Sequence, residues 1–244
     1  MGYGYQTRIA YHEIDPHRKL TLSGLINRFQ DCGGFHGDDC GYSNKQLADM
    51  GLAWILASWQ IVITEMPELS ERVWLETFPY KYRYCMANRY FRLSSTEGKE
   101  FVRADSVWIL MNMKQYAPVR IPQEMADAYG RDGAEDIFKG YDFGGRKIEK
   151  DDSFKPLDEI CVAKYMIDTN YHVNNEQYVR IAQAYLPEGF EWNTFRGEYT
   201  KQARLGDKMI PELAADGNVC RIALSDENGD PYFLGEWSKK DTQI

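Results

Sequence analysis

Two stretches of the chain repeat apolar residues at the spacing of an amphipathic helix. The apolar stripe is Leu22, Leu25, Ile26 and Phe29 in the first stretch and Tyr178, Ile181, Ala182 and Tyr185 in the second. Residues at i, i+3, i+4 and i+7 share one face of an α-helix, so each helix is expected to bury one side. The segments that follow each helix read as strands joined by turns.

The two helices belong to an internal repeat. Three pairs of segments correspond in the same order along the chain: 11–30 with 164–183, 59–77 with 195–213, and 98–108 with 229–239. Such a repeat indicates one supersecondary unit used twice. Each copy is predicted to be α+β: a strand, a polar loop, a long helix and then an antiparallel sheet that the helix covers. We place the N-terminal domain at 1–121, a Gly-rich, charged linker at 122–152 and the C-terminal domain at 153–244.

Composition narrows the classes of function. The chain has 29 basic and 37 acidic residues and a net charge of −8, which argues against binding of nucleic acid through its phosphates. Its five cysteines form no C-x-x-C pair, so neither a disulfide framework nor a zinc site is expected, and a cytoplasmic location fits. No stretch approaches the ~20 apolar residues of a membrane span. We expect no metal and no cofactor.

The loop before the second helix, DTNYHVNNEQYV at 168–179, is the strongest chemical signal. In the matching loop of the first half, His17 stands in place of Asn170 and Lys19 in place of His172. The second half therefore carries an Asp, Asn and His pattern typical of a catalytic site, and the first half lacks it.

Hydrolysis of a thioester needs a positioned water, a proton acceptor and donors for the developing oxyanion. The Asn170 amide can hold the water or the carbonyl, and His172 or Asp168 can accept the proton. A helix that begins at Asn174 or Asn175 offers unpaired N–H groups and the positive end of its dipole to the carbonyl oxygen. The alternatives are a turn role for Asp168 and helix capping for the two asparagines.

Four segments, taken together, resemble the acyl-acyl carrier protein thioesterases of plant plastids and their bacterial relatives. They are RADSVWILMN with the following VRIP, MGLAWILASWQIVITEMPE, DTNYHVNNEQYV and EYTKQARLGD. The resemblance covers nearly the whole chain. It implies a double hotdog fold, hydrolysis of fatty acyl-acyl carrier protein in fatty acid biosynthesis, and catalytic roles for Asp168, Asn170 and His172. It also implies that the N-terminal hotdog holds substrate without catalysing.

The sequence departs from the family pattern at one strand. Where the family typically reads EYRREC, this chain has EYTKQA, so Gln202 replaces a catalytic glutamate and Ala203 replaces a cysteine. A glutamine accepts no proton, which favours attack by water, with Gln202 orienting it. Glu198 is a candidate supporting carboxylate on the same predicted strand face as Gln202, although four residues along a strand span about 13 Å.

An acyl carrier protein is acidic, so an acidic enzyme needs local positive charge to receive it. The candidates are Lys81, Arg83, Arg89 and Arg92 in the first half and Lys201, Arg204 and Lys208 in the second. Of these, we select Arg83, Arg89, Lys201 and Arg204. Two other functions stay open from the residues alone: hydrolysis of acyl-coenzyme A, and non-catalytic binding of acyl groups. Pairing of two chains as a homodimer is also left open.

Overall fold

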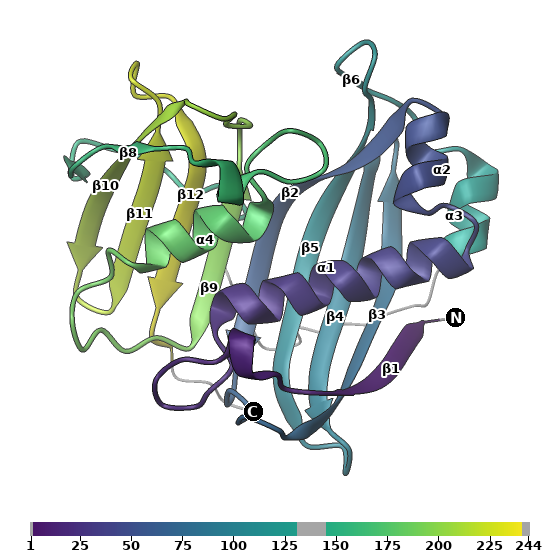
Figure 1. Ribbon diagram of the computed structural model, residues 1–244, viewed down its shortest axis with the longest axis horizontal. Helices are drawn as coiled ribbons and strands as arrows, with labels where there is room; N and C mark the ends of the chain where they lie inside the picture. The colour runs from purple at the N-terminus through teal and green to yellow at the C-terminus, as the bar shows by residue number, and fades with distance from the viewer. Residues whose placement is uncertain (1, 131–144, 241–244) are drawn as a thin grey trace. The chain divides into compact units, whose positions relative to one another are not determined.

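The computed structural model describes residues 2–130 and 145–240, and the chain divides into two compact units. The first unit comprises Met1–Ala57 and Ile63–Tyr141, and the second comprises Ser58–Val62 and Asp142–Ile244. In each unit one helix lies across an antiparallel sheet (Figure 1). This is the α+β arrangement that the repeat predicted.

The first unit is built around helix α1. Its elements are β1 (Tyr3–Arg8), the 3₁₀ helix η1 (Tyr11–Glu13), α1 (Leu22–Asp39), α2 (Asn44–Asp49), β2 (Leu52–Ile63), β3 (Arg72–Arg83), β4 (Met86–Ser95), β5 (Glu100–Asn112), β6 (Ala117–Pro118) and α3 (Gln123–Tyr129). The main strands lie in the order β1-β3-β4-β5-β2. Thr21 caps α1 by accepting a hydrogen bond from the Gly24 N–H at 3.1 Å. The predicted stripe of α1 is buried, with Leu25, Ile26 and Phe29 at 0% exposure.

The second unit repeats this plan with shorter elements. They are β7 (Lys155–Pro156), β8 (Ile160–Cys161), η2 (Lys164–Met166), α4 (Asn175–Gln183), β9 (Thr194–Tyr199), β10 (Lys208–Asp216), β11 (Val219–Ser225) and β12 (Pro231–Ser238). The strand order is β9-β12-β11-β10, with β7 and β8 both paired to β10, and residues Ser58–Val62 of β2 pair with β9. If β8 corresponds to β1 and β9 to β2, both units have the same strand order.

Helix α4 follows the predicted stripe only in part. Tyr178 and Ala182 are buried, but the helix ends at Gln183, so Tyr185 falls outside it. The Tyr178 ring packs on the sheet, 6.0 Å from the ring centroid of Phe233 and 5.9 Å from that of Tyr199.

Two predictions about the connections were wrong. The segment that opens each repeat was predicted as a strand, but Tyr11–Glu13 and Lys164–Met166 form 3₁₀ turns. The predicted linker 122–152 contains helix α3, whose Met125 and Tyr129 are buried in the first unit. Near its other end Ile148 is buried in the core of the second unit. A few well-spaced apolar residues outweigh the Gly-rich, charged composition, and residues 131–144 lie outside the described residues.

Candidate active site

The loop that carries Asn170 and His172 is a turn organised by one aspartate. Asp168 Oδ1 accepts hydrogen bonds from the N–H groups of Asn170 at 2.8 Å and His172 at 3.3 Å. The Asp168 N–H in turn donates to the His172 carbonyl at 2.8 Å. Tyr171, at the tip, has a φ of 63° and an exposed side chain. The Asp168 carboxylate therefore fixes the backbone conformation at Asn170 and His172.

The first unit builds the same turn without those side chains. Asp15 Oδ1 accepts from the N–H groups of His17 at 2.8 Å and Lys19 at 2.9 Å, and Arg18 at the tip has a φ of 65°. The Asp15 N–H donates to the Lys19 carbonyl at 2.9 Å. Asp168 thus has a structural role in the turn that does not require a catalytic function. A turn role was the alternative to catalysis that the sequence left open for this residue.

His172 differs from the exposed side chains around it. It is 6% exposed, and within the part of the chain that the structure describes its buried Nδ1 has no hydrogen-bond partner. Burial and, next, the positive charge of Arg204 lower the pKa of His172, and the negative charge of Asp168 opposes them only in part. The imidazole is therefore neutral near pH 7 and able to accept a proton. A buried polar atom without a partner calls for an explanation, and a catalytic role is one of the explanations.

The start of helix α4 is more fully hydrogen-bonded than the sequence predicted. The Asn174 side chain accepts from the Glu176 N–H at 3.1 Å, and its carbonyl accepts from the Gln177 N–H at 2.9 Å. The N–H groups of Val173 and Asn174 donate to other backbone carbonyls. The N–H groups of these four residues are therefore not unpaired, contrary to the prediction. Asn174 satisfies those of Glu176 and Gln177 as the N-cap, and the carbonyls of Ala203 and Met166 satisfy the other two. The catalytic role of Asn175 stays a prediction.

The segment after β9 lies beside the loop. The Ala203 carbonyl accepts from the Val173 N–H at 2.9 Å, and the Ala203 N–H donates to the Tyr178 hydroxyl at 2.8 Å. These bonds hold the exposed Gln202 next to the turn that carries His172. Burial raises the pKa of the Tyr178 phenol, so the hydroxyl is a neutral positioning group.

The structure does not place Glu198 and Gln202 on one strand face. β9 ends at Tyr199, so Gln202 lies outside the strand and the two-residue alternation stops before it. Glu198 Oε2 accepts from the Ile148 N–H at 2.8 Å, whereas the neighbouring Tyr199 hydroxyl donates to the Asn175 carbonyl at 3.0 Å. Neighbouring strand residues point to opposite faces, so Glu198 points away from helix α4.

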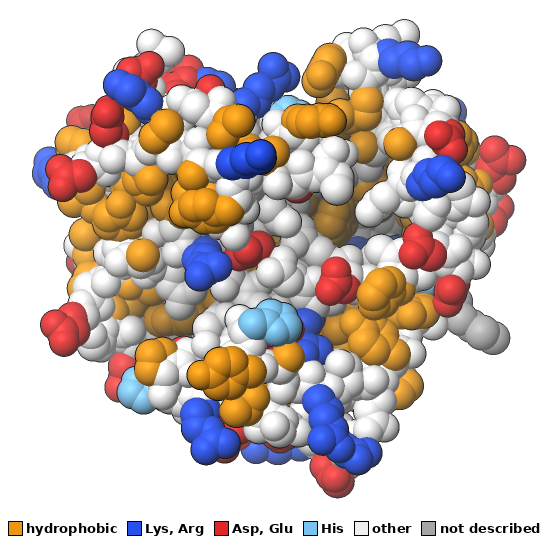
Figure 2. All heavy atoms as spheres, viewed as in Figure 1, with side chains coloured by type: hydrophobic (Ala, Val, Ile, Leu, Met, Phe, Trp, Pro, Cys, Tyr) orange, Lys and Arg blue, Asp and Glu red, His pale blue; other side chains and the backbone are white. Residues whose placement is uncertain are grey.

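The four predicted carrier-binding cations have different surroundings. Arg89 is buried at 9% exposure, which overturns its assignment to a docking surface. Lys201 pairs with Asp226. Arg83 and Arg204 are exposed, and no ion pair holds either of them within residues 2–130 and 145–240. On the face shown in Figure 2, basic and acidic side chains are interspersed and form no broad basic field.

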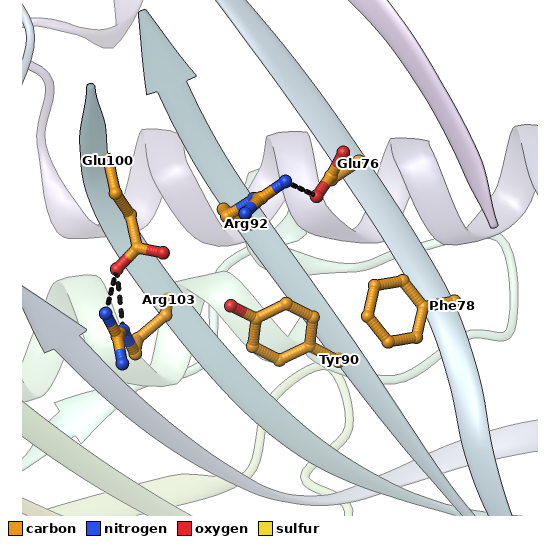
Figure 3. Close-up of a pocket in the computed structure, with 6 residues that line it drawn as sticks. All are labelled: Glu76, Phe78, Tyr90, Arg92, Glu100 and Arg103. Atoms are coloured by element: carbon orange, nitrogen blue, oxygen red, sulfur yellow. Dashed lines mark hydrogen bonds and ion pairs between the residues drawn. The ribbon is translucent and has the colours of Figure 1, made fainter. Parts of the chain in front are cut away.

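A shallow depression on the first unit was not foreseen from the sequence. It encloses about 280 Å³ and is lined by Glu76, Phe78, Tyr90, Arg92, Glu100 and Arg103 (Figure 3). Arg92 pairs with Glu76 and Arg103 pairs with Glu100, each at 2.5 Å. Each of the two cations that line the depression therefore already has a carboxylate partner.

The described residues contain no group of three or more His, Cys, Asp or Glu side chains suited to a metal ion. Over the same residues, no helix has both the length and the apolar character to cross a bilayer.

Comparison with known proteins agrees with this architecture. The acyl-ACP thioesterase from Bacteroides thetaiotaomicron aligns with a TM-score of 0.81 at 21% identity, covering 97% of both chains. The 12:0-ACP thioesterase from Umbellularia californica aligns with a TM-score of 0.81 at 18% identity, covering 97% of this chain and 96% of its own. At these identities the likeness shows the fold, and the duplicated helix-on-sheet unit is a double hotdog.

The sequence itself supplies the family. Residues 2–129, more than half of the 244-residue chain, match the acyl-ACP thioesterase N-terminal domain. The chain therefore belongs to the acyl-ACP thioesterase family. The chloroplastic acyl-[acyl-carrier-protein] hydrolase FATB3 of Cuphea viscosissima is 25% identical over 254 residues, covering 95% of this chain. The chain spans 61% of the length of that relative.

Proposed function

We propose that the protein hydrolyses fatty acyl thioesters of acyl carrier protein to free fatty acid, with water as the nucleophile. The observation that carries this proposal is the buried imidazole of His172, whose Nδ1 has no partner among the described residues, on the same turn as the Asn170 amide. Family membership and the names of the relatives support the carrier as acyl donor.

The proposed reaction uses His172 as the base. Its neutral imidazole takes a proton from water as the water oxygen bonds to the thioester carbon. The Asn170 amide donates to the oxygen on which negative charge develops. Collapse of the tetrahedral intermediate breaks the carbon–sulfur bond, and the thiolate recovers the proton from the imidazolium. Asp168 is assigned to ordering the turn, because its Oδ1 already accepts two backbone N–H groups.

Hydrolysis assays on purified protein test this assignment. Dodecanoyl and hexadecanoyl groups are supplied on acyl carrier protein and on coenzyme A. Asn170→Ala and His172→Ala are each expected to lower kcat/KM at least a hundredfold while the circular dichroism spectrum is kept. His17→Ala is the matched control, since His17 holds the position of Asn170 in the first-unit turn, and full activity is expected.

The same assay separates the alternatives. Higher kcat/KM with the carrier protein supports the proposal, and higher kcat/KM with coenzyme A identifies an acyl-coenzyme A thioesterase. Background rates with every substrate would leave a non-catalytic acyl-binding protein. We keep the exposed Arg204 as the proposed carrier contact in this unit; Lys201, paired with Asp226, is less available. The cytoplasmic location and the pairing of two chains stay predictions.

A further inference from the structure

The sheet of the first unit has an exposed tyrosine at each of two neighbouring turns. Tyr84 lies at the tip of the hairpin between β3 and β4 and is 67% exposed, and Tyr116 lies in the turn between β5 and β6 and is 64% exposed. Met86 at the start of β4 pairs with Ile109 near the end of β5. Both turns therefore leave the same end of the sheet.

Arg120 is held between these turns by the backbone on each side of it. The Val119 N–H donates to the Leu110 carbonyl at 2.9 Å, and the Ile121 N–H donates to the Tyr84 carbonyl at 2.8 Å. The Arg120 side chain is exposed. It therefore leaves the backbone beside the tip of the hairpin.

Neither the turns nor the core explains the two tyrosines. Tyr84 has a φ of 53° and Tyr116 a φ of 49°, in the left-handed region where glycine is the usual residue. The second unit uses glycine there: its β10–β11 hairpin, which takes the place of the β3–β4 hairpin in the strand order, carries Gly217 with a φ of 54°. Because both rings are exposed, core packing does not require them either. The rings are therefore candidates for contact with another molecule.

Three exposed cations accompany the tyrosines. Arg83 is next to the hairpin tip, Lys114 lies in the β5–β6 turn and Arg120 lies between the two. Among residues 2–130 and 145–240, no carboxylate forms an ion pair with any of the three, including Glu124 on the nearby helix α3. The chain has a net charge of −8, so this end of the sheet is a local concentration of positive charge on an acidic protein.

Exposed tyrosines beside unpaired cations are typical of proteins that bind the surface of an anionic bilayer. A tyrosine ring enters the headgroup layer with its hydroxyl toward water, and anionic lipids attract Lys and Arg. Met86, at 39% exposure, adds an apolar side chain to the same end of the sheet. Figure 2 shows hydrophobic and basic side chains together where β6 lies in Figure 1. We call this set the tip surface: Arg83, Tyr84, Met86, Lys114, Tyr116 and Arg120.

The acidic carrier protein is the other partner that such a surface fits. The proposed carrier contact, however, is Arg204 in the second unit, whose positive charge acts on His172. The tip surface carries none of the groups of the proposed reaction. In Figure 1 the turn that leads to β6 also stands clear of α2 and α3, so a flat partner can reach it. These observations favour a bilayer.

We propose that the tip surface binds the headgroup layer of an anionic lipid bilayer. The two tyrosine rings and Met86 enter the layer, while Arg83, Lys114 and Arg120 lie against the anionic headgroups. The binding itself does not depend on hydrolysis. Its consequence rests on the proposed function: the protein releases its fatty acid beside a bilayer that dissolves it.

Vesicle flotation tests the contribution of charge. The probes are vesicles of phosphatidylcholine alone and of phosphatidylcholine mixed equally with phosphatidylglycerol. Wild-type protein is expected to bind the mixed vesicles at least tenfold more tightly than the neutral ones. Replacing Arg83, Lys114 and Arg120 together by Gln should abolish that preference, because each cation near an anionic bilayer contributes to the attraction. Equal binding to both vesicles by the wild type would overturn the proposal.

A second variant tests the rings. Tyr84→Asn combined with Tyr116→Asn keeps residues that tolerate the left-handed backbone, so the fold should persist, and the circular dichroism spectrum checks this. Affinity for the mixed vesicles is expected to fall at least fivefold. Unchanged affinity in this variant would refute insertion of the tyrosines.

The matched control removes three cations from the other end of the sheet. Arg8 ends β1, Arg72 begins β3 and Arg18 lies in the Asp15 turn; all three are exposed. Replacing them together by Gln changes the net charge as much as the tip variant does, and it should leave the preference for mixed vesicles intact. If it removes the preference equally, binding follows net charge and the tip surface is refuted.

Carrier kinetics identify the competing partner. If the tip variant binds both kinds of vesicle like the wild type but raises KM for dodecanoyl carrier protein at least fivefold, the tip surface receives the carrier and the bilayer proposal is wrong. Flotation of His172→Ala keeps the proposal separate from the proposed function. This variant should bind mixed vesicles like the wild type even though its hydrolysis is lost.

Discussion

The Tyr178 hydroxyl accepts a hydrogen bond from the Ala203 N–H at 2.8 Å, which joins helix α4 to the segment that carries Gln202. Tyr178 is 2% exposed and Ala203 is fully buried, so solvent cannot replace this bond. A tyrosine in an otherwise apolar stripe therefore helps to set the position of the candidate site.

Tyr178→Phe removes that acceptor and leaves a buried N–H unpaired. We expect a loss of about 1–3 kcal/mol in the free energy of unfolding, measured by urea denaturation. Activity should fall as well, because the segment next to the His172 turn loosens. Tyr165→Phe alters a hydroxyl on a side chain that is 75% exposed and should change neither quantity.

Asp168 and Asp15 allow the structural part of the turn to be separated from the chemical part. Asp168→Asn keeps a side-chain oxygen that can accept the two N–H groups, so activity within tenfold of wild type is expected. Asp168→Ala should lower kcat at least a hundredfold, because the turn loses its organising acceptor. Asp15→Ala should lower thermal stability without changing kcat. A hundredfold loss in Asp168→Asn would show that the carboxylate itself takes part in the reaction.

The activity should depend on the ionisation of His172. Burial lowers the pKa of His172, so kcat/KM should rise with pH through an apparent pKa below 6.5 and then level. Arg204→Gln removes a positive charge that lowers the same pKa, and the acidic limb should move to higher pH. NMR titration of the imidazole measures this shift. The free energy of unfolding should also fall at low pH. The imidazole has a higher pKa in the unfolded chain than in the folded one, so protonation favours the unfolded state below about pH 6.5.

Gln202→Glu restores a carboxylate beside the turn. It should raise kcat, because a negative charge near the imidazolium stabilises the state that forms when water is deprotonated. It should also raise the pKa of His172. Gln115→Glu, an exposed position in the first unit, is the control and should have no effect. An unchanged rate in Gln202→Glu would mean that the missing carboxylate does not limit hydrolysis.

The sequence predicted the features that depend on local periodicity. The spacing of apolar residues predicted the repeat and the buried stripe of α1. It also predicted the strand pairs β2 and β3, which flank residues 64–71, and β9 and β10, which flank residues 200–207. The polar turn was also visible, because Asp15 and Asp168 stand at equivalent positions. The family resemblance supplied the double hotdog, which the alignments with solved structures confirm.

Other features depend on tertiary contacts that no local pattern encodes. Arg89 reads as a surface cation in a polar stretch, yet the strand turns it under α1, where His36 and Thr77 receive it. The end of β9 at Tyr199 could not be seen, since no Gly or Pro follows in EYTKQA to mark where the strand stops. Asn174 proved to be a cap, and a sequence alone cannot tell a capped N–H from a vacant one.

The paired turns share an organising aspartate, although catalysis is proposed for only one of them. In both units an aspartate fixes the same backbone conformation through the same hydrogen bonds. The conformation of the turn therefore does not depend on which side chains the turn carries. At the two positions assigned to the reaction, Asn170 stands where the first unit has His17, and His172 stands where it has Lys19. New chemistry in a duplicated architecture of this kind requires no remodelling of the main chain.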